Sequence, residues 1–325
     1  MASYFYTNFV PTLLHALFVF QALEFCYPHA LTNVSCIDAE REALLKFKQD
    51  LIDPSRNLLS WTGKRCCEWE GVKCNHRTSH VSQLNLIGRG LGGKIDPALS
   101  ELRCLKYLRL GNNNFNGHLP NQCGNFKHLE FTSLSHNSIS GHIPSTIGQL
   151  ASLRHLDLSY NNLSGNIPES IGQLRNLELM HFGNNRLHGV VNELHLANLT
   201  SLTQLSLQSN ELVINVSASW VPPFQIIFIN LSSCKVGPEF PNWLQTQRII
   251  SELYMSNASI SGEVPNWLLD IISNIELLDL SGDMHGGNNF QIMGKKDTTI
   301  KIGITFQITS MLTFQIHYVC YMHVI

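Results

Sequence analysis

Apolar residues recur along this chain in one repeated order. Between Leu153 and Leu174 the order is L-x-x-L-x-L-x-x-N-x-L-x-G-x-I-P, and the same spacing returns on both sides of this segment. Aligned at the first apolar residue of the L-x-L core, successive copies lie 24 or 25 residues apart. The aligned anchor positions are Leu84, Leu108, Thr132, Leu156, Met180, Leu205, Ile229, Leu253 and Leu278. A period kept over so many copies predicts a chain of stacked structural repeats.

Each copy also predicts its own local structure. The L-x-L core predicts a short strand whose two apolar side chains point inward and whose intervening residue points outward. Five residues after the anchor an Asn can bond backbone groups of the turn; Cys234 takes this position once and is predicted to be buried and unpaired. This row holds Asn113, Asn137, Asn161, Asn185 and Asn210, and it is interrupted at Arg89, Ala258 and Asp283. Together the pattern and the period are typical of leucine-rich repeats. The predicted fold class is therefore an α/β repeat solenoid of about nine repeats over residues 81–283, with a parallel sheet on its concave side.

The first thirty residues contain no Lys, Arg or Asp, and Glu24 is their one acidic residue. An apolar segment at residues 9–23 is too short to cross ~30 Å of hydrocarbon. It suits the apolar region of a secretory signal peptide, although no cation precedes it. A buried helix is the alternative, but the repeats begin only later, so we interpret residues 1–30 as a signal peptide.

Residues 31–80 precede the repeats and predict a terminal cap. Asp38 can begin a helix that Pro54 stops, and the exposed end of a repeat stack requires covering. The segment contains the cysteines Cys36, Cys66, Cys67 and Cys74. Four cysteines allow three pairings, and the one that bridges the adjacent Cys66 and Cys67 is geometrically poor. Of the two that remain, we choose Cys36–Cys66 with Cys67–Cys74. A zinc site is disfavoured because the segment lacks two separated C-x-x-C pairs.

The cap sequence "EREALLKFKQDL…LLSW…CCEWEGVKCN" resembles the N-terminal cap of plant extracellular leucine-rich-repeat proteins. Those include receptor-like proteins, receptor-like kinases and polygalacturonase-inhibiting proteins. The G-x-[IV]-P segments at 141–144, 165–168 and 262–265 are similar to the plant-type repeat, and residues 220–247 resemble the middle repeats of receptor-like proteins. The resemblance covers about residues 36–283. It implies extracellular recognition and, for complete family members, a membrane anchor and a co-receptor kinase partner.

Residues 284–325 depart from the repeat pattern. Apolar residues alternate with polar ones from Ile300 to Ile308, which predicts a strand. No Asp, Glu, Lys or Arg occurs at 302–325, so a membrane span has to be considered. Such a span would place Gln307, Gln315 and two His in hydrocarbon with no cation after them. We interpret the segment as a divergent tail of a truncated chain.

Composition excludes several function classes. With a net charge of −2 and 14% charged residues, the chain has no basic patch of the kind that nucleic-acid binding needs. Nine cysteines favour an oxidising compartment. The sequence lacks the HExxH, G-x-S-x-G and G-K-[ST] motifs, its His residues are scattered, and the "GRGLGG" at 88–93 lies at a repeat turn. We therefore expect no enzyme activity, no cofactor and no metal.

The outward positions of the strands predict a binding surface on the concave face. One column, just before the anchors, holds Tyr107, Phe131, His155, Leu179 and Gln204; a second, just after them, holds Arg109, Ser133, Asp157, His181 and Ser206. Tyr160 extends this surface. Aromatic residues and Arg are common at binding hot spots. We expect Asp157 to pair with His181 and to raise its pKa, so that affinity for a peptide or glycan would depend on pH. The alternative is an ordinary solvated strand face.

Glycosylation is predicted from N-x-[ST] sequons. They occur at Asn33, Asn162, Asn198, Asn215, Asn230 and Asn257. Asn230 occupies an outward position of the predicted sheet, so a glycan there would keep ligands away from that part of the face.

The function predicted from these features is non-catalytic recognition of a peptide, protein or glycan by a receptor-like ectodomain, in defence or development. The predicted location is the cell surface or the apoplast. Two alternatives remain open: a secreted inhibitor of microbial cell-wall hydrolases, and a truncated fragment that does not signal.

Overall fold

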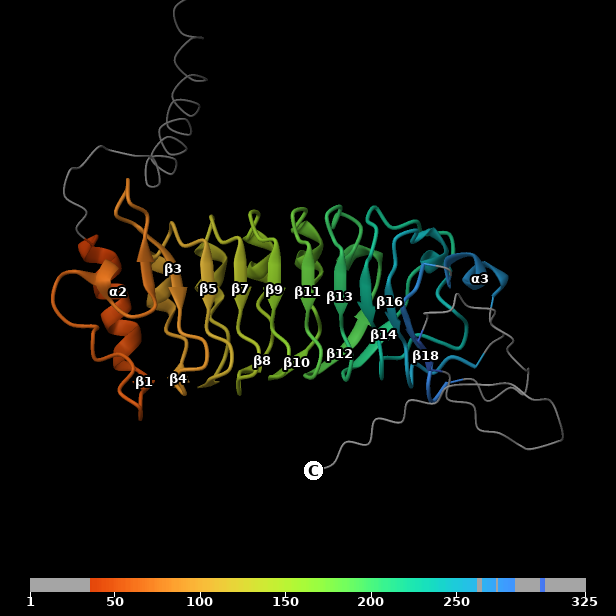
Figure 1. The fold of residues 1–325 in the computed structure, drawn as a ribbon, viewed down its shortest axis with the longest axis horizontal. Coiled ribbons are helices and arrows are strands. Elements are labelled where there is room, and N and C mark those ends of the chain that lie inside the picture. The colour runs from red at the N-terminus through yellow and green to blue at the C-terminus, as the bar shows by residue number, and fades with distance from the viewer. Residues whose placement is uncertain (1–35, 262–264, 273, 284–298, 302–325) are drawn as a thin grey trace, which may run out of the picture.

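The computed structural model describes residues 36–261, 265–272, 274–283 and 299–301. It is an elongated stack in which one short strand per repeat builds a long sheet (Figure 1). The predicted signal peptide, the sequon at Asn33 and the segment 302–325, which was weighed as a membrane span, lie outside the described residues. Among the described residues, no helix is long and apolar enough to cross a bilayer.

The long sheet has eleven strands in the order β18-β17-β16-β15-β13-β11-β9-β7-β5-β3-β2. Their bounds are β2 Val72–Cys74, β3 Val81–Asn85, β5 Tyr107–Arg109, β7 Phe131–Ser133, β9 His155–Asp157, β11 Leu179–His181, β13 Gln204–Ser206, β15 Phe228–Asn230, β16 Glu252–Tyr254, β17 Leu277–Asp279 and β18 Thr299–Lys301. Strands β3 to β18 pair in parallel, and β2 pairs antiparallel with β3. Each anchor residue pairs with the next anchor, from Leu84 with Leu108 to Leu253 with Leu278. The fold class predicted from the repeat period is therefore confirmed.

Strand β18 extends the sheet beyond the repeats that the sequence predicts. Ile300 pairs with Leu278, the last anchor, although the chain between them lacks the repeat pattern. The alternation of apolar residues did predict a strand here, and its first residues join the row. A parallel edge strand such as β17 offers unpaired backbone groups to any extended segment, whatever its sequence.

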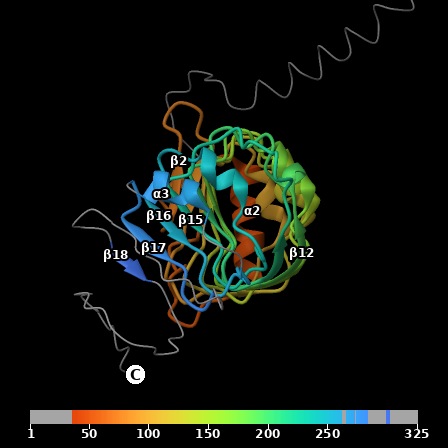
Figure 2. The same cartoon turned by 90° about the vertical axis from the view of Figure 1, so that its right-hand side faces the viewer.

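A second line of strands forms where the repeats carry the Asn-x-Leu-x-Gly segment. One short sheet joins β1 Leu51–Ile52, β4 Gly92–Lys94 and β6 Asn114–Asn116; another joins β8 Ser140–Gly141, β10 Asn162–Gly165, β12 Arg186–Val191 and β14 Glu211–Ile214. Viewed along the stack, β12 lies on the side opposite β15, β16 and β17 (Figure 2). The sequence shows no alternation there, so it did not predict these strands. They form because the stack brings successive backbones into register at strand spacing.

Short 3₁₀ helices and one α-helix close most repeats. The 3₁₀ helices are η3 Pro97–Glu101, η4 Asn121–Asn125, η5 Ser145–Gln149, η6 Glu169–Gln173, η7 Glu193–His195 and η8 Asn242–Thr246, and the α-helix is α3 Asn266–Ile272. Proline occupies the N-cap of η4, η5, η6 and η8 and the first position of η3. Its fixed backbone angle suits the start of a helical turn, and its missing N–H is not needed there. The Pro of each G-x-I-P segment therefore marks the start of the closing turn.

The repeat that begins at Leu205 lacks the G-x-I-P segment. Its strand β14 extends to Ile214 and pairs with β12 over four residues before a loop begins. Beyond it, the rings of Trp220 and Phe224 pack edge-on against Trp243 of η8. The loop is thus attached to the core by aromatic contacts in place of the G-x-I-P turn.

The predicted Asn row bonds the turns of neighbouring repeats together. Asn161 donates through Nδ2 to the carbonyls of Leu134, Leu158 and Ser159 and accepts from the amide of Ile139. The other four Asn residues bond in the same way. Cys234 is buried and free, as predicted, and its Sγ lies 3.2 Å from the carbonyl oxygen of Leu207.

One interruption of the row was wrongly predicted. The carboxylate of Asp283 accepts from the amides of Ala258 and Ile260, at 2.9 and 3.0 Å. Asp283 therefore keeps the accepting half of the Asn arrangement and loses only the donating half, because a carboxylate has the same acceptor geometry as an amide oxygen.

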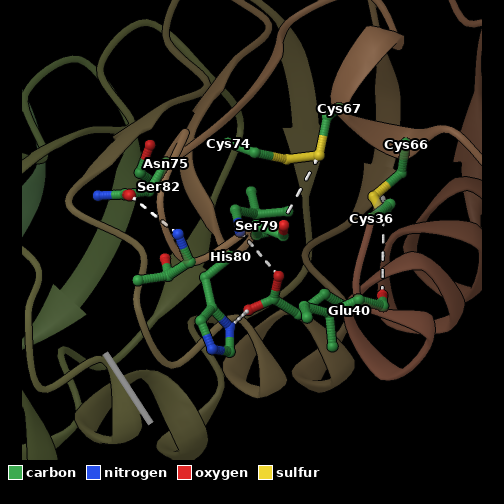
Figure 3. Close-up of polar contacts among 12 residues, drawn as sticks. Cys36, Glu40, Cys66, Cys67, Cys74, Asn75, Ser79, His80 and Ser82 are labelled. Carbon is green, nitrogen blue, oxygen red and sulfur yellow. Dashed lines mark hydrogen bonds and ion pairs between the residues drawn. A yellow bond between two sulfur atoms is a disulfide. The ribbon is translucent and has the colours of Figure 1, made fainter. Parts of the chain in front are cut away.

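The cap covers the N-terminal end of the stack, where α2 lies (Figure 1), and Figure 3 shows its disulfides and the contact between Glu40 and His80. Helix α2 Asp38–Gln49 buries Leu44 and Phe47, and the 3₁₀ helix η2 Cys66–Glu68 precedes β2. Disulfides join Cys36 to Cys66 and Cys67 to Cys74, the pairing favoured from the sequence. The buried carboxylate of Glu40 accepts from the amide of Val81 at 2.7 Å and contacts His80 Nδ1 at 2.9 Å. This contact ties the cap helix to the first repeat strand.

A cavity lies in the core beside β7. Thr132 occupies an anchor position at which the neighbouring strands have Leu108 and Leu156. The cavity of about 40 Å³ lies beside it, and Cys123, Phe126 and Leu156 are among its lining residues. Cys123 is half-buried, with its Sγ 3.7 Å from Thr146 Oγ1.

Candidate functional site

The candidate site is the outward face of strands β5, β7, β9 and β11, called here the β5–β11 surface. Strand pairing sets Tyr107 beside Phe131 and Phe131 beside His155, with Leu179 next. The second column runs in the same register through Arg109, Ser133, Asp157 and His181. Each central strand residue is buried, and the residues on both sides of it are half-buried, because the strand alternates between core and solvent.

Rings and a guanidinium stack along the start of this surface. The Phe131 and His155 rings lie 5.2 Å apart, measured between centroids. Arg109 Cζ lies 4.6 Å from the centroid of Phe131 and 5.8 Å from that of Tyr107. Both distances are within the range of a cation–π contact. The aromatic row that the sequence suggested is therefore joined by a cation from the neighbouring column.

Two ion pairs border the aromatic row. Lys106 Nζ lies 2.7 Å from Glu130 Oε1, and the Tyr107 hydroxyl donates to the same carboxylate at 3.4 Å. One repeat along, Arg154 pairs with Glu178, and His155 Nε2 lies 3.4 Å from the other oxygen of Glu178. These four charges are neutralised in pairs and contribute little net field to the surface.

The expected pairing of Asp157 with His181 was wrong. Asp157 accepts from Ser133 Oγ, from Ser159 Oγ and from the Ser159 amide. His181 Nε2 is buried with no hydrogen-bond partner among the described residues. Burial lowers the pKa of His181; Asp157 opposes this shift and His155 adds to it. The sequence could show that the two residues share a column, but not that nearby serines would bond the carboxylate and that packing would dehydrate the imidazole.

Two residues that were predicted to form the binding surface contribute less to it than expected. Tyr160 lies beyond the end of β9, at a turn with positive φ, where its ring stacks on that of His136 at 4.1 Å. It is therefore on the rim of the face and not in either column. Ser206 is buried and donates to Gln208, whereas Gln204 stays half-buried in the first column.

Two aromatic residues of the same face were missed. Phe228 continues the first column and Tyr254 the second, and their rings lie 5.7 Å apart. His181 approaches Phe228 at 6.0 Å. Burial, the hydrogen bond to Glu252 and the charges of Glu252 and Asp279 raise the pKa of Tyr254 to about 12. Extending both columns past Leu205 in the sequence would have identified them.

The sequons differ in their surroundings. Asn162, Asn198, Asn215 and Asn257 are exposed. Asn230 is half-buried on β15, in register with Ser206 and Tyr254, and its Oδ1 accepts from the amide of Ser232 at 3.0 Å. That bond leaves Nδ2, the atom that carries a glycan, available.

In the described part of the chain, one cluster contains residue types that can bind a metal ion. Its chemistry does not support a metal site. The sulfurs of Cys36, Cys66 and Cys67 lie close together, but all three are in disulfides. A disulfide sulfur is not the thiolate that a metal binds.

Family models match the two parts described above. Residues 37–75 match a leucine-rich repeat N-terminal domain, and residues 84–218 match a leucine-rich repeat region. The chain therefore contains a leucine-rich-repeat cap and leucine-rich repeats. Both are similar to those of plant receptor-like proteins, such as the following relative.

The leucine-rich-repeat chain is 42% identical over 113 residues to the receptor-like protein EIX2 of Solanum lycopersicum, covering 34% of this chain and 11% of that protein. It spans about a tenth of the length of such curated relatives. Solved structures share the fold: PEPR1-AtPEP1 has a TM-score of 0.60 at 23% identity, covering 76% of this chain and 42% of that one. The GASSHO1/SCHENGEN3 ectodomain of Arabidopsis thaliana, solved with CASPARIAN STRIP INTEGRITY FACTOR 2, has a TM-score of 0.54 at 22% identity, covering 75% and 35%.

Proposed function

We propose that this chain is the recognition part of a plant receptor-like protein and that it binds an extracellular peptide or protein segment on the β5–β11 surface. The observation that supports this most directly is the stack of Tyr107, Arg109, Phe131 and His155. A few hot-spot residues carry most of the binding energy in protein interfaces, and Trp, Tyr and Arg are enriched among them.

The wider features agree with this proposal. The relatives are receptor-like proteins, and the GASSHO1/SCHENGEN3 ectodomain was solved with a bound factor on the same fold. Two disulfides in the cap favour an oxidising compartment, hence the cell surface or the apoplast. No specific observation favours the hydrolase-inhibitor alternative.

The proposal retains the predicted division of the chain: a signal peptide at 1–30, a cap at 31–80, repeats at 81–283 and a divergent tail at 284–325. The proposed role is non-catalytic and needs no cofactor. A co-receptor kinase and a membrane anchor belong to the proposal for the whole receptor.

The test is a selection for binders with defined variants. The secreted chain would be used to select peptides from a phage-displayed random library, and affinities would be measured for the wild type and for Phe131→Ala, His181→Ala and Glu169→Ala. Truncating a hot-spot residue costs about 2 kcal/mol, so the first two variants should weaken binding roughly thirtyfold. Glu169 is exposed on η6, outside the sheet, and its variant should bind normally. Binders unaffected by Phe131→Ala and His181→Ala would place recognition elsewhere.

A further inference from the structure

Arg109 differs from the other cations of the β5–β11 surface. Lys106 and Arg154 each have a glutamate partner, in Glu130 and Glu178. Arg109 has no carboxylate within ion-pair distance and no hydrogen-bond partner for its Nε, among the residues that the structure describes. Its contacts are with two aromatic rings, those of Tyr107 and Phe131.

The nearest unpaired acid in the same column does not neutralise this charge. Asp157 lies two strands away, which is about 10 Å at normal strand spacing. Ser133 and Ser159 donate three hydrogen bonds to its carboxylate. His155 and His181 lie on β9 and β11, farther from Arg109 than the β7 residues Phe131 and Ser133. Neither His carries a negative charge. The β5 end of the surface is therefore positive.

The stacking also fixes the guanidinium before any ligand arrives. A flexible Arg side chain loses rotamer freedom on binding, and a side chain already held against two rings loses less. Nε is buried, so the terminal nitrogens provide the donors. A planar guanidinium matches a carboxylate, which can accept two parallel hydrogen bonds from it.

We infer that Arg109 is the anchor for a carboxylate of an acidic peptide segment, and that Phe131 and His155 hold an apolar or aromatic side chain beside it. This inference rests on the proposed function and specifies the chemistry of the ligand. The predicted ligand places an Asp or Glu side chain, or a C-terminal carboxylate, against β5. Beside that carboxylate, it places a hydrophobic residue over β7 and β9.

The experiment uses peptides selected from the random library on the secreted chain. Asp and Glu should be enriched among the binders relative to the unselected library. One acidic binder and its Asn/Gln counterpart would then be titrated against the wild type, Arg109→Gln, Arg109→Lys and Arg186→Gln. Thermal unfolding of each variant would show that it is folded.

Arg109→Gln should weaken the acidic peptide roughly tenfold or more, while the neutral counterpart should bind the wild type and Arg109→Gln equally. Arg109→Lys should retain part of the affinity, since it keeps the charge and loses the planar fork. Arg186→Gln is the control with the same change of charge, because Arg186 is exposed on β12, outside the long sheet, and it should change little.

The outcomes separate the inference from the function. Binders that depend on Phe131 but show no acidic preference, or that bind Arg109→Gln as tightly as the wild type, would overturn the inference and leave the proposed function standing. Binders that depend on neither Phe131 nor Arg109, or no binders at all, would overturn both.

Discussion

At the scale of single residues, the amide side chains of the Asn row hold the turns in place. Each one satisfies carbonyl and amide groups from two neighbouring repeats that packing has removed from water. The residue before each Asn has positive φ, as Asn112, His136, Tyr160, Asn184 and Ser209 show. The sharp turn requires this conformation in every repeat. Tyr160 therefore has a structural role in the turn in addition to presenting an exposed ring.

Asn113→Ala should destabilise the fold by roughly 2–3 kcal/mol, because buried groups left without a partner keep their desolvation penalty. Asn113 donates to the carbonyls of Leu86, Leu110 and Gly111 and accepts from the amides of Arg89 and Leu91. The neighbouring Asn114 has an exposed side chain, and Asn114→Ala should cost far less. Urea unfolding of both variants measures the difference; equal losses would contradict this role.

His181 should make the stability of the fold sensitive to acid. Burial lowers its pKa in the folded state below the ordinary value of 6.5, so the unfolded chain takes up a proton first. Its contribution is fully present above pH 6.5 and is lost as the pH falls through the lower, folded-state pKa. Urea unfolding at several pH values should show a smaller acid-induced loss for His181→Asn than for the wild type. The exposed His188 provides the control: His188→Asn should follow the wild-type profile.

At the scale of elements, each repeat strand from β3 to β17 in the long sheet carries one anchor residue that faces the interior. The anchor is Leu, Met or Ile in most repeats and Thr132 in β7. Thr132 lines the cavity beside β7 together with the neighbouring anchors Leu108 and Leu156. A larger side chain at this position would have space to occupy.

Thr132→Leu should stabilise the chain by about 1 kcal/mol, since each buried methylene contributes about 0.8 kcal/mol and part of the gain is spent on repacking. Met180→Leu, at an anchor that is already filled, should change stability little. Thermal or urea unfolding would compare the two. A loss of stability in Thr132→Leu would show that the cavity cannot accept the larger side chain.

At the scale of the whole molecule, the outward face divides into two aromatic regions. One is the β5–β11 surface, and the other is formed by Phe228 and Tyr254 on β15 and β16. Asn230 lies within the second region. A glycan on Asn230 would cover those rings and leave the first region open.

Glycopeptide mapping of the secreted chain should find Asn230 occupied. Asn230→Gln should not change the affinity of peptides whose binding depends on Phe131, because β15 lies four strands from β7, which is roughly 19 Å at normal strand spacing. An unoccupied Asn230, or a change in affinity in Asn230→Gln, would show that the second region takes part in binding.

The repeat period, the anchors and both outward columns follow from the sequence alone. They are decided by spacing, because a strand alternates its side chains and stacked repeats keep one register. Only the tertiary structure decided which polar groups find partners. It bonds Asp157 to serines, leaves His181 dehydrated, stacks Arg109 on Phe131 and lets Asp283 continue the Asn row. Those outcomes depend on distances of a few ångströms and on the exclusion of water. The spacing of residues along the sequence determines neither of them.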